Sequence, residues 1–401
     1  MKKIIIVGAG PAGATAAYLF AKHGIHVVLI EKASTFDRVF RGEALMPLGL
    51  DALKELGLLD EVFELPNRHI NSWDMYVGNK QIFQVFEPKE DLGYQAVRVV
   101  SQPAYLEMVT EKAQHFDHFE LRMNTPVRDL IWENGRVVGV KLRSGEEIQA
   151  DYVLGCDGRG SLVRSRADIK LNLLPESYDI LWFKFPAPKQ RHGSTDVMFM
   201  GSIKHTALCY NSWDNQMRYA LMLPKGTISQ NRNRVWFDSL CEPAPAWLQA
   251  HLASVRDEIS KPDLLNVIVG RASAWSKPGL LLIGDAAHPM SPIRAQGINL
   301  ALRDVISVAN HIIPALKETG DVDKAATAVS AERLPEIERA QQLQLREAQG
   351  QGNERLRPLL INIAKATGPL FGRFEWAKKS WLNQQKELRF GTVDIQLKLS
   401  E

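Results

Sequence analysis

The 401-residue sequence has little of several features that would assign it to a specialised class of protein. Its three cysteines are far apart, so neither a disulfide framework nor a cysteine-based metal site is indicated. No uncharged apolar run reaches the roughly 18 residues of a transmembrane helix. The net charge is only +3, and basic residues are not interleaved with aromatic ones, which argues against a nucleic-acid partner. We therefore expect a soluble, cytoplasmic enzyme without a metal that acts on a small molecule.

An apolar segment followed by a glycine-rich turn begins the chain. Residues Ile4–Val7 precede Gly8, Gly10 and Gly13 in Gly-x-Gly-x-x-Gly order, and a helix-like stretch follows. In this motif the glycines permit a tight turn, close approach of backbone N–H groups to a pyrophosphate, and close packing of helix on strand. The helix N-terminus also favours phosphate charge. The predicted cofactor contacts in this turn are Gly8, Gly10, Pro11, Ala12 and Gly13.

A second strand, expected over His26–Ile30, ends at Glu31 and Lys32. In dinucleotide-binding folds a carboxylate about 20 residues after the turn binds the ribose hydroxyls. Strand, turn, helix and acid therefore occur at the expected spacing. They predict a Rossmann-type site with Glu31 and Lys32 beside the cofactor.

A related strand-loop-helix pattern lies far downstream. A strand over Leu280–Ile283 is followed by Gly284-Asp285 and by a helix that begins near Gln296. An acid at the end of a buried strand can reach ribityl or ribose hydroxyls, and the following helix N-terminus offers free N–H groups. The predicted cofactor contacts here are Gly284, Asp285, Pro292, Gln296, Gly297, Ile298 and Asn299.

A third block lies between these two. A buried strand over Val153–Gly155 ends in Asp157-Gly158, and Ser161 is placed to cap a helix that carries Arg164. A purely structural turn is one interpretation of this block. A contact of Asp157 and Arg164 with the cofactor is the other.

The three blocks together resemble the FAD-dependent monooxygenases of the aromatic-hydroxylase type, whose fold is like that of p-hydroxybenzoate hydroxylase. The resemblance rests on the glycine turn with Glu31, on Arg41-Gly42-Glu43, and on residues 151–164 and 284–299. It implies an α/β fold: a Rossmann-type FAD-binding domain with an inserted β-sheet substrate domain and a helical C-terminal region. It also implies FAD as the cofactor. The cofactor contacts that the resemblance implies include Arg41, Gln102, Val127, Asp157 and Arg164.

The sequence departs from the family pattern at two places. Arg294-Ala295 stands where the flavin-facing loop usually has Gly-Gly, and Arg294 is expected to favour an anionic reduced flavin. Gln102 stands where an arginine is usual, and Arg98 is expected to substitute for that phosphate partner. Both changes affect the predicted cofactor site.

Changes in hydrophobic period predict a discontinuous domain organisation. A hairpin over Ser72–Phe86 turns at Gly78-Asn79, and a sheet-rich region lies at about 173–228. The Gln-rich stretch Gln341–Gln351 is interpreted as a solvated helix face. We predict an FAD-binding domain from residues 1–70, 93–172 and 268–325, a substrate domain from 71–92 and 173–267, and a helical C-terminal region at 326–401.

The resemblance also implies the chemistry. The expected enzyme uses NAD(P)H and O2 to hydroxylate or epoxidise a small hydrophobic or aromatic substrate through a flavin C4a-hydroperoxide. No second dinucleotide motif is visible, so NADPH or NADH is expected to dock transiently. Pro292 is expected beside the reacting carbon, and His205 and Tyr210 are candidate catalytic groups of the inserted sheet. A monomer or homodimer is expected.

Three other functions remain open at this point. A reductase of the same superfamily would work without oxygen. A halogenase would be expected to carry a Trp-x-Trp-x-Ile-Pro element, which the sequence does not contain. A non-catalytic flavin-binding protein could use the helical C-terminal region as its partner surface.

Overall fold

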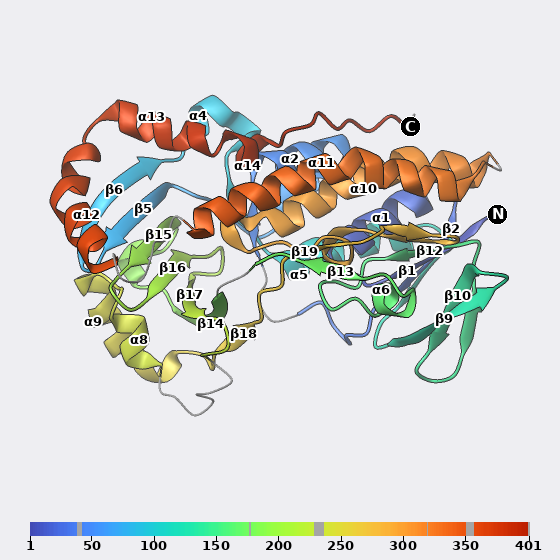
Figure 1. Cartoon of the computed structure of the whole chain (residues 1–401), viewed down its shortest axis with the longest axis horizontal. Coiled ribbons are helices and arrows are strands. Elements are labelled where there is room, and N and C mark those ends of the chain that lie inside the picture. The colour runs from blue at the N-terminus through green and yellow to red at the C-terminus, as the bar shows by residue number, and fades with distance from the viewer. Residues whose placement is uncertain (38–41, 176–177, 228–235, 319, 350–356, 400–401) are drawn as a thin grey trace.

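The computed structural model describes residues 1–37, 42–175, 178–227, 236–318, 320–349 and 357–399. Two sheet-containing parts lie at opposite ends of an elongated molecule (Figure 1). Two long helices cover the part that contains β1 (Lys3–Val7) and β12 (Tyr152–Gly155), and the end of one of them reaches the other part. These are α10 (Gln296–Lys317) and α11 (Val322–Gln349), which pack against each other. The predicted mixed α/β fold is confirmed.

A six-stranded sheet forms the first part, in the order β20-β21-β12-β1-β2-β8. All neighbouring strands are parallel except β20, and β1, β12 and β21 are almost wholly buried, as expected for strands covered on both faces. The strands are β1 (Lys3–Val7), β2 (His26–Ile30), β8 (Phe119–Arg122), β12 (Tyr152–Gly155), β20 (Ser276–Lys277) and β21 (Leu280–Leu282). The helices α1 (Pro11–Lys22), α5 (Gln102–Gln114) and α10 pack around this sheet.

Two hairpins follow residue 127. The strands β9 (Val127–Glu133), β10 (Arg136–Leu142) and β11 (Glu147–Gln149) form an antiparallel sheet. Its turns place Asn134, Gly135 and Gly145 at positive φ, where asparagine and glycine are favoured.

A seven-stranded sheet forms the second part, in the order β18-β14-β17-β16-β15-β5-β6. The predicted hairpin around Gly78 pairs with strands from the later region, because β5 lies parallel to β15. Alternate residues such as Leu181 and Phe183 pack on α8 (Phe237–Cys241) and α9 (Ala246–Ser254). The strands are β5 (Ser72–Val77), β6 (Lys80–Phe86), β14 (Tyr178–Pro186), β15 (Asp196–Gly201), β16 (Thr206–Asn211), β17 (Gln216–Pro224) and β18 (Asp263–Leu265).

The predicted helical C-terminal region is also confirmed, but two glutamines of the predicted solvated face point inward, whereas Gln342 is exposed. Gln341 and Gln344 of α11 are 1% exposed, and both donate hydrogen bonds to backbone carbonyls of neighbouring segments. Residues 350 and 351 of that predicted face lie outside the described residues. The last helices are α12 (Arg357–Phe371), α13 (Glu375–Gln384) and α14 (Lys386–Phe390).

Shorter elements connect these parts. They are β3 (Ala44–Leu45), α2 (Pro47–Glu55), α3 (Leu59–Glu64), β4 (Asn67–His69), α4 (Lys89–Leu92), β7 (Arg98–Val100), α6 (Leu162–Arg166), β13 (Leu171–Leu173) and β19 (Gly270–Ala272), with one-turn 3₁₀ helices at Gly93–Gln95, Lys189–Arg191, Arg256–Glu258, Gly284–Ala286 and Ile293–Ala295. Among the described helices, none has the length and apolar character required to cross a membrane.

Candidate cofactor and substrate cavity

One cavity of about 1,350 Å³ extends from the glycine turn after β1 to the inner face of the seven-stranded sheet. It exceeds the roughly 300–1,000 Å³ of a typical small-molecule pocket, so it offers room for a dinucleotide and a second molecule. The predicted site residues that line it are Gly8, Gly10, Pro11, Ala12, Glu31, Lys32, Gln102, Val127, Asp157, Tyr210, Gly284, Asp285, Pro292, Gly297 and Ile298.

The glycine turn leaves space only where a ligand would approach. A Cβ on Gly8 would lie 2.6 Å from the Cys156 carbonyl oxygen, and one on Gly13 would lie 1.9 Å from the Gly8 carbonyl oxygen. Gly10 lines the cavity, and a Cβ there would meet nothing within 4 Å. No side chain caps the N-terminus of α1, so its N–H groups are available to an anion. The turn therefore fits a pyrophosphate.

Glu31 is fixed beside this turn. It is 3% exposed, and its two carboxylate oxygens accept hydrogen bonds from the backbone N–H groups of Ala9 and Ala33, both at 2.9 Å. The carboxylate is thus held in one orientation at the cavity wall. This arrangement suits a ribose hydroxyl pair.

Arg159 and Asp285 form a charged pair at the cavity wall. Arg159 Nη2 lies 3.3 Å from Asp285 Oδ2, and both residues line the cavity. The Nε and Nη1 atoms of Arg159 are buried and have no hydrogen-bond partner within the part of the chain that the structure describes. Such donors are costly to leave unsatisfied, which favours an anionic ligand at this point. Sequence reasoning did not single out Arg159, although its place in a turn between a buried strand and a helix was a usable signal.

Asp157 lines the cavity but is occupied by its own turn. Its carboxylate accepts hydrogen bonds from the Ser161 hydroxyl at 2.5 Å and from the N–H groups of Leu162 and Val163 at 2.7 and 3.0 Å. Burial raises the pKa of Asp157, while these hydrogen bonds act in the opposite direction. The Ser161 hydroxyl accepts from the Arg164 N–H, as predicted for a cap. The geometry thus favours the structural interpretation for Asp157.

Four other predicted contacts support the cavity from behind and do not line it. The Arg164 guanidinium donates to the carbonyls of Ala286 and Arg159. Asn299 accepts from the Met46 N–H and donates to the carbonyls of Ala44 and Ala295. These placements do not support direct cofactor contact. Three of the four side chains are used in joining segments of backbone, and the fourth residue, a glycine, has no side chain and packs against Gly8. The four residues are Gly13, Arg164, Gln296 and Asn299.

Two other predicted groups also lie elsewhere. His205 does not line the cavity; its Nδ1 lies 3.2 Å from the Glu242 carboxylate. Arg98 stacks on Phe63 and donates to Asn67, so it does not take the place of the usual arginine at Gln102. The expectations for His205 and Arg98 are therefore corrected. Arg41 lies outside the described residues.

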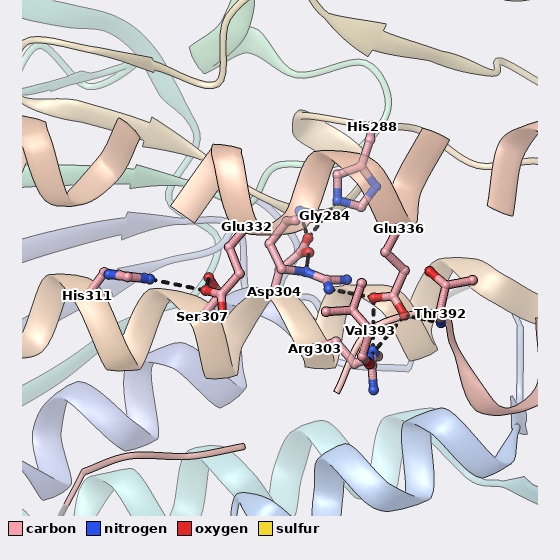
Figure 2. Close-up of polar contacts among 11 residues, drawn as sticks. Gly284, His288, Arg303, Asp304, Ser307, His311, Glu332, Glu336, Thr392 and Val393 are labelled. Carbon is pink, nitrogen blue, oxygen red and sulfur yellow. Dashed lines mark hydrogen bonds and ion pairs between the residues drawn. The ribbon is translucent and has the colours of Figure 1, made fainter. Parts of the chain in front are cut away.

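A buried charge network supports the loop that follows β21 (Figure 2). Asp304 of α10 accepts from the Gly284 N–H at 3.0 Å and lies 2.6 Å from His288 Nε2. Arg333 of α11 donates to Asp304 at 2.8 Å and also pairs with Glu336. Burial alone would raise the pKa of Asp304, but its contacts with His288 and Arg333 lower it. The network fixes Gly284 at the cavity wall through two helices.

A second polar cluster lies at the sheet end of the cavity. Glu43 and Tyr210 line the cavity, and both are buried. Arg218 donates two hydrogen bonds to Glu43 Oε1 at 3.0 and 3.2 Å, and the Ser212 hydroxyl donates to Oε2. Burial raises the pKa of Glu43, although Arg218 and Ser212 oppose the shift. Burial, followed by the Glu43 charge, raises the pKa of Tyr210 well above its usual value, so Tyr210 remains a hydrogen-bond donor.

Comparisons with known proteins agree with this geometry. A family profile described as "FAD binding domain" matches residues 1–344. The 6-methylpretetramide 4-monooxygenase of Streptomyces rimosus is 30% identical over 351 residues, which cover 85% of this chain and 82% of that relative. The 3-demethoxyubiquinol 3-hydroxylase of Escherichia coli is 25% identical over 342 residues, which cover 78% of this chain and 80% of that relative.

Solved structures show the same fold. The p-nitrophenol 4-monooxygenase of Pseudomonas putida DLL-E4 has a TM-score of 0.79 at 19% identity and covers 98% of this chain and 100% of its own. PqsL of Pseudomonas aeruginosa, solved with 2-aminobenzoylacetate, has a TM-score of 0.75 at 20% identity and covers 90% of this chain and 99% of its own.

Proposed function

Because the chain belongs to the FAD binding domain family, whose relatives here are monooxygenases, we propose that it uses NAD(P)H and O2 to hydroxylate or epoxidise a hydrophobic or aromatic substrate. The observation that carries this proposal is the continuous cavity that joins the nucleotide-binding turn to the sheet face. A monooxygenase needs that continuity, because the redox ring and the substrate must meet where water is excluded.

FAD fits the first part of the cavity. The turn around Gly10, the Glu31 carboxylate and the unsatisfied donors of Arg159 would hold the nucleotide, and Asp285 would hold the ribityl chain. When bound, the flavin supplies two-electron chemistry and oxygen activation. The protein supplies binding, orientation and a closed environment.

The sheet end of the cavity fits a planar substrate. Trp182, Phe199 and Met222 line it together with Pro292 of the loop before α10. In our proposal Tyr210 donates a hydrogen bond to a substrate oxygen, and the Glu43 carboxylate accepts the proton of a substrate hydroxyl. An aromatic substrate is favoured by two similar proteins. One relative is named as a 6-methylpretetramide monooxygenase, and the structure of PqsL was solved with 2-aminobenzoylacetate.

The reductant is proposed to be NADPH or NADH, bound only transiently. The sequence holds one Gly-x-Gly-x-x-Gly motif that follows a strand and precedes a helix, and FAD occupies it in this proposal. A second nucleotide would therefore bind at the protein surface.

The test is an absorption spectrum of the purified protein, followed by an assay of flavin reduction and product formation. The purified protein is expected to show flavin absorption, and NAD(P)H is expected to bleach it faster when an aromatic ligand is present. Incorporation of one atom of ¹⁸O2 into the product would then identify oxygen transfer. Product formed under strict anaerobiosis would instead support a reductase, and halide-dependent product would support a halogenase. Bleaching that no ligand accelerates would favour a non-catalytic flavin-binding protein.

A further inference from the structure

Arg294 occupies a strained position at the cavity wall. Its φ is +60°, and that of Ala295 is +52°. Because neither residue is a glycine, this left-handed conformation costs about 1–3 kcal/mol for each of them. Side-chain amides hold the loop in this shape. Gln344 donates to the carbonyls of Ser291 and Ile293, Gln296 donates to that of Arg294, and Asn299 donates to that of Ala295. The fold thus maintains an arginine in an unfavourable conformation, which indicates a use for its side chain.

The guanidinium is held by residues from three different elements. Its central carbon lies 5.3 Å from the ring centre of Phe199 on β15 and 5.1 Å from that of Trp381 on α13. Its Nε lies 2.9 Å from the Glu347 carboxylate on α11. The side chain is 11% exposed. These contacts leave it little freedom to turn away from the cavity.

The salt bridge satisfies only part of the guanidinium. Nη1 of Arg294 is buried and has no partner among the residues that the structure describes, whereas the Glu347 contacts involve Nε alone. Arg389, the other nearby cation, is already paired with the buried Glu87. A buried charged donor without an acceptor is unfavourable by more than the roughly 1–3 kcal/mol of a neutral one. An anionic oxygen from a ligand would satisfy it.

We propose that Arg294 and Glu347 form a recognition site for an anionic oxygen, a carboxylate or an ionised enol, attached to a planar aromatic substrate. The Arg294 guanidinium donates to the anion, and the neighbouring Phe199 contacts the ring. The Glu347 carboxylate, which also lines the cavity, orients the guanidinium and repels the anion. This inference rests on the proposed function, since it names the substrate class of the same cavity.

The experiment compares two ligands of nearly equal shape on the flavin-loaded protein. The affinities of 3-hydroxy-2-naphthoate and 3-hydroxy-2-naphthamide are measured from the change in flavin absorption, without reductant. The acid is expected to bind at least about tenfold more tightly than the amide, as for a hydrogen bond to a charged group. Arg294→Gln is expected to reduce that ratio to about one by weakening the acid alone.

Glu347→Gln should change the ratio in the opposite direction, because it removes the repelling charge and leaves the arginine in place. Arg339→Gln serves as the matched control, because Arg339 lies on the same helix as Glu347 and its ion pair with Glu387 of α14 is exposed. This variant should leave the ratio unchanged. Equal binding of acid and amide by the native protein would overturn the inference. It would equally be overturned if Arg294→Gln shifted the flavin midpoint potential but kept the native ratio.

These outcomes are independent of turnover. A native preference for the acid that disappears in Arg294→Gln would support the anion site even if no ligand yields an oxygenated product. In that case the proposed function would be contradicted, while the anion site would remain supported.

Discussion

Two glycines of the first turn are expected to have different roles, one in cofactor binding and the other in folding. Gly10 has an ordinary extended conformation and open space around its missing Cβ, whereas a Cβ on Gly13 would collide with the Gly8 carbonyl oxygen. We therefore expect the first glycine to serve cofactor binding. The second serves the packing of α1 on β1.

Gly10→Ala and Gly13→Ala are expected to have different effects. The first should leave the unfolding of the apoprotein nearly unchanged and weaken FAD binding by at least about tenfold, or ~1.4 kcal/mol. The second should lower the free energy of unfolding of the apoprotein by about 1–3 kcal/mol. Urea unfolding of the apoprotein and fluorescence titration with FAD measure the two quantities. An apoprotein destabilised equally by both changes would contradict this assignment.

Arg159 is expected to bind the cofactor, while its neighbour Arg164 holds the loop. Arg159→Gln should weaken FAD binding by about 10- to 100-fold. The change removes two donors that have no partner among the described residues and that are expected to bind the anionic cofactor. The thermal stability of the apoprotein should not change. Arg166→Gln, on the exposed side of α6, is the matched control. Normal FAD affinity in Arg159→Gln would show that its donors do not face the cofactor.

Helices α10 and α11 act together through Asp304. Asp304→Asn leaves the fully buried Arg333 short of one negative partner, so the free energy of unfolding should fall by about 3–5 kcal/mol. FAD affinity should also fall, because Asp304 fixes the Gly284 N–H at the cavity wall. Glu332→Gln, which affects the more exposed pair with His311, should have a much smaller effect on both quantities. Chemical unfolding and FAD titration of the two variants distinguish the roles.

The same helix pair should make stability depend on acid pH. The pKa of Asp304 is lower in the folded protein than its unfolded value of about 3.9. A carboxylate with a lowered folded pKa stabilises the protein above the unfolded pKa, and this stabilisation is lost as the pH falls through the folded value. The stability difference between the native protein and Asp304→Asn should therefore shrink below about pH 4. A difference that stays constant down to pH 2.5 would exclude this linkage.

At the scale of the whole molecule, a buried ion pair joins the C-terminal region to the seven-stranded sheet. Arg389 of α14 pairs with Glu87, which follows β6 and also accepts from the Trp73 indole N–H at 2.8 Å. Both charged side chains are at most 3% exposed. The C-terminal helices are therefore a structural part of the end of the molecule that contains the seven-stranded sheet.

Removing one partner of this pair should be more harmful than removing both. Arg389→Met should lower the free energy of unfolding by about 3–5 kcal/mol, because Glu87 keeps an uncompensated buried charge. The double variant Arg389→Met with Glu87→Gln should be more stable than the sum of the single changes by about 0.5–3 kcal/mol. Arg339→Gln, at an exposed pair, should have no measurable effect. Strict additivity in the cycle would show that the two side chains are not energetically coupled.

Local sequence patterns are sufficient to predict the nucleotide-binding end of the fold. The glycine turn, the strand that ends at Glu31 and the hairpins around Gly78 and Gly135 follow from near neighbours in the chain. Turn conformation, strand period and helix start are local properties, so a linear pattern is sufficient to predict them.

Which side chains face the cavity depends on the packing of distant segments and could not be predicted from the sequence. Arg159 lines it while Arg164 does not, His205 lies elsewhere, and Gln344 is buried against the loop that carries Arg294. Each of these outcomes depends on how helices and strands from distant parts of the chain pack together. A side chain's direction relative to such partners has no period or spacing in the sequence, and it is set only when the elements come together in the folded protein.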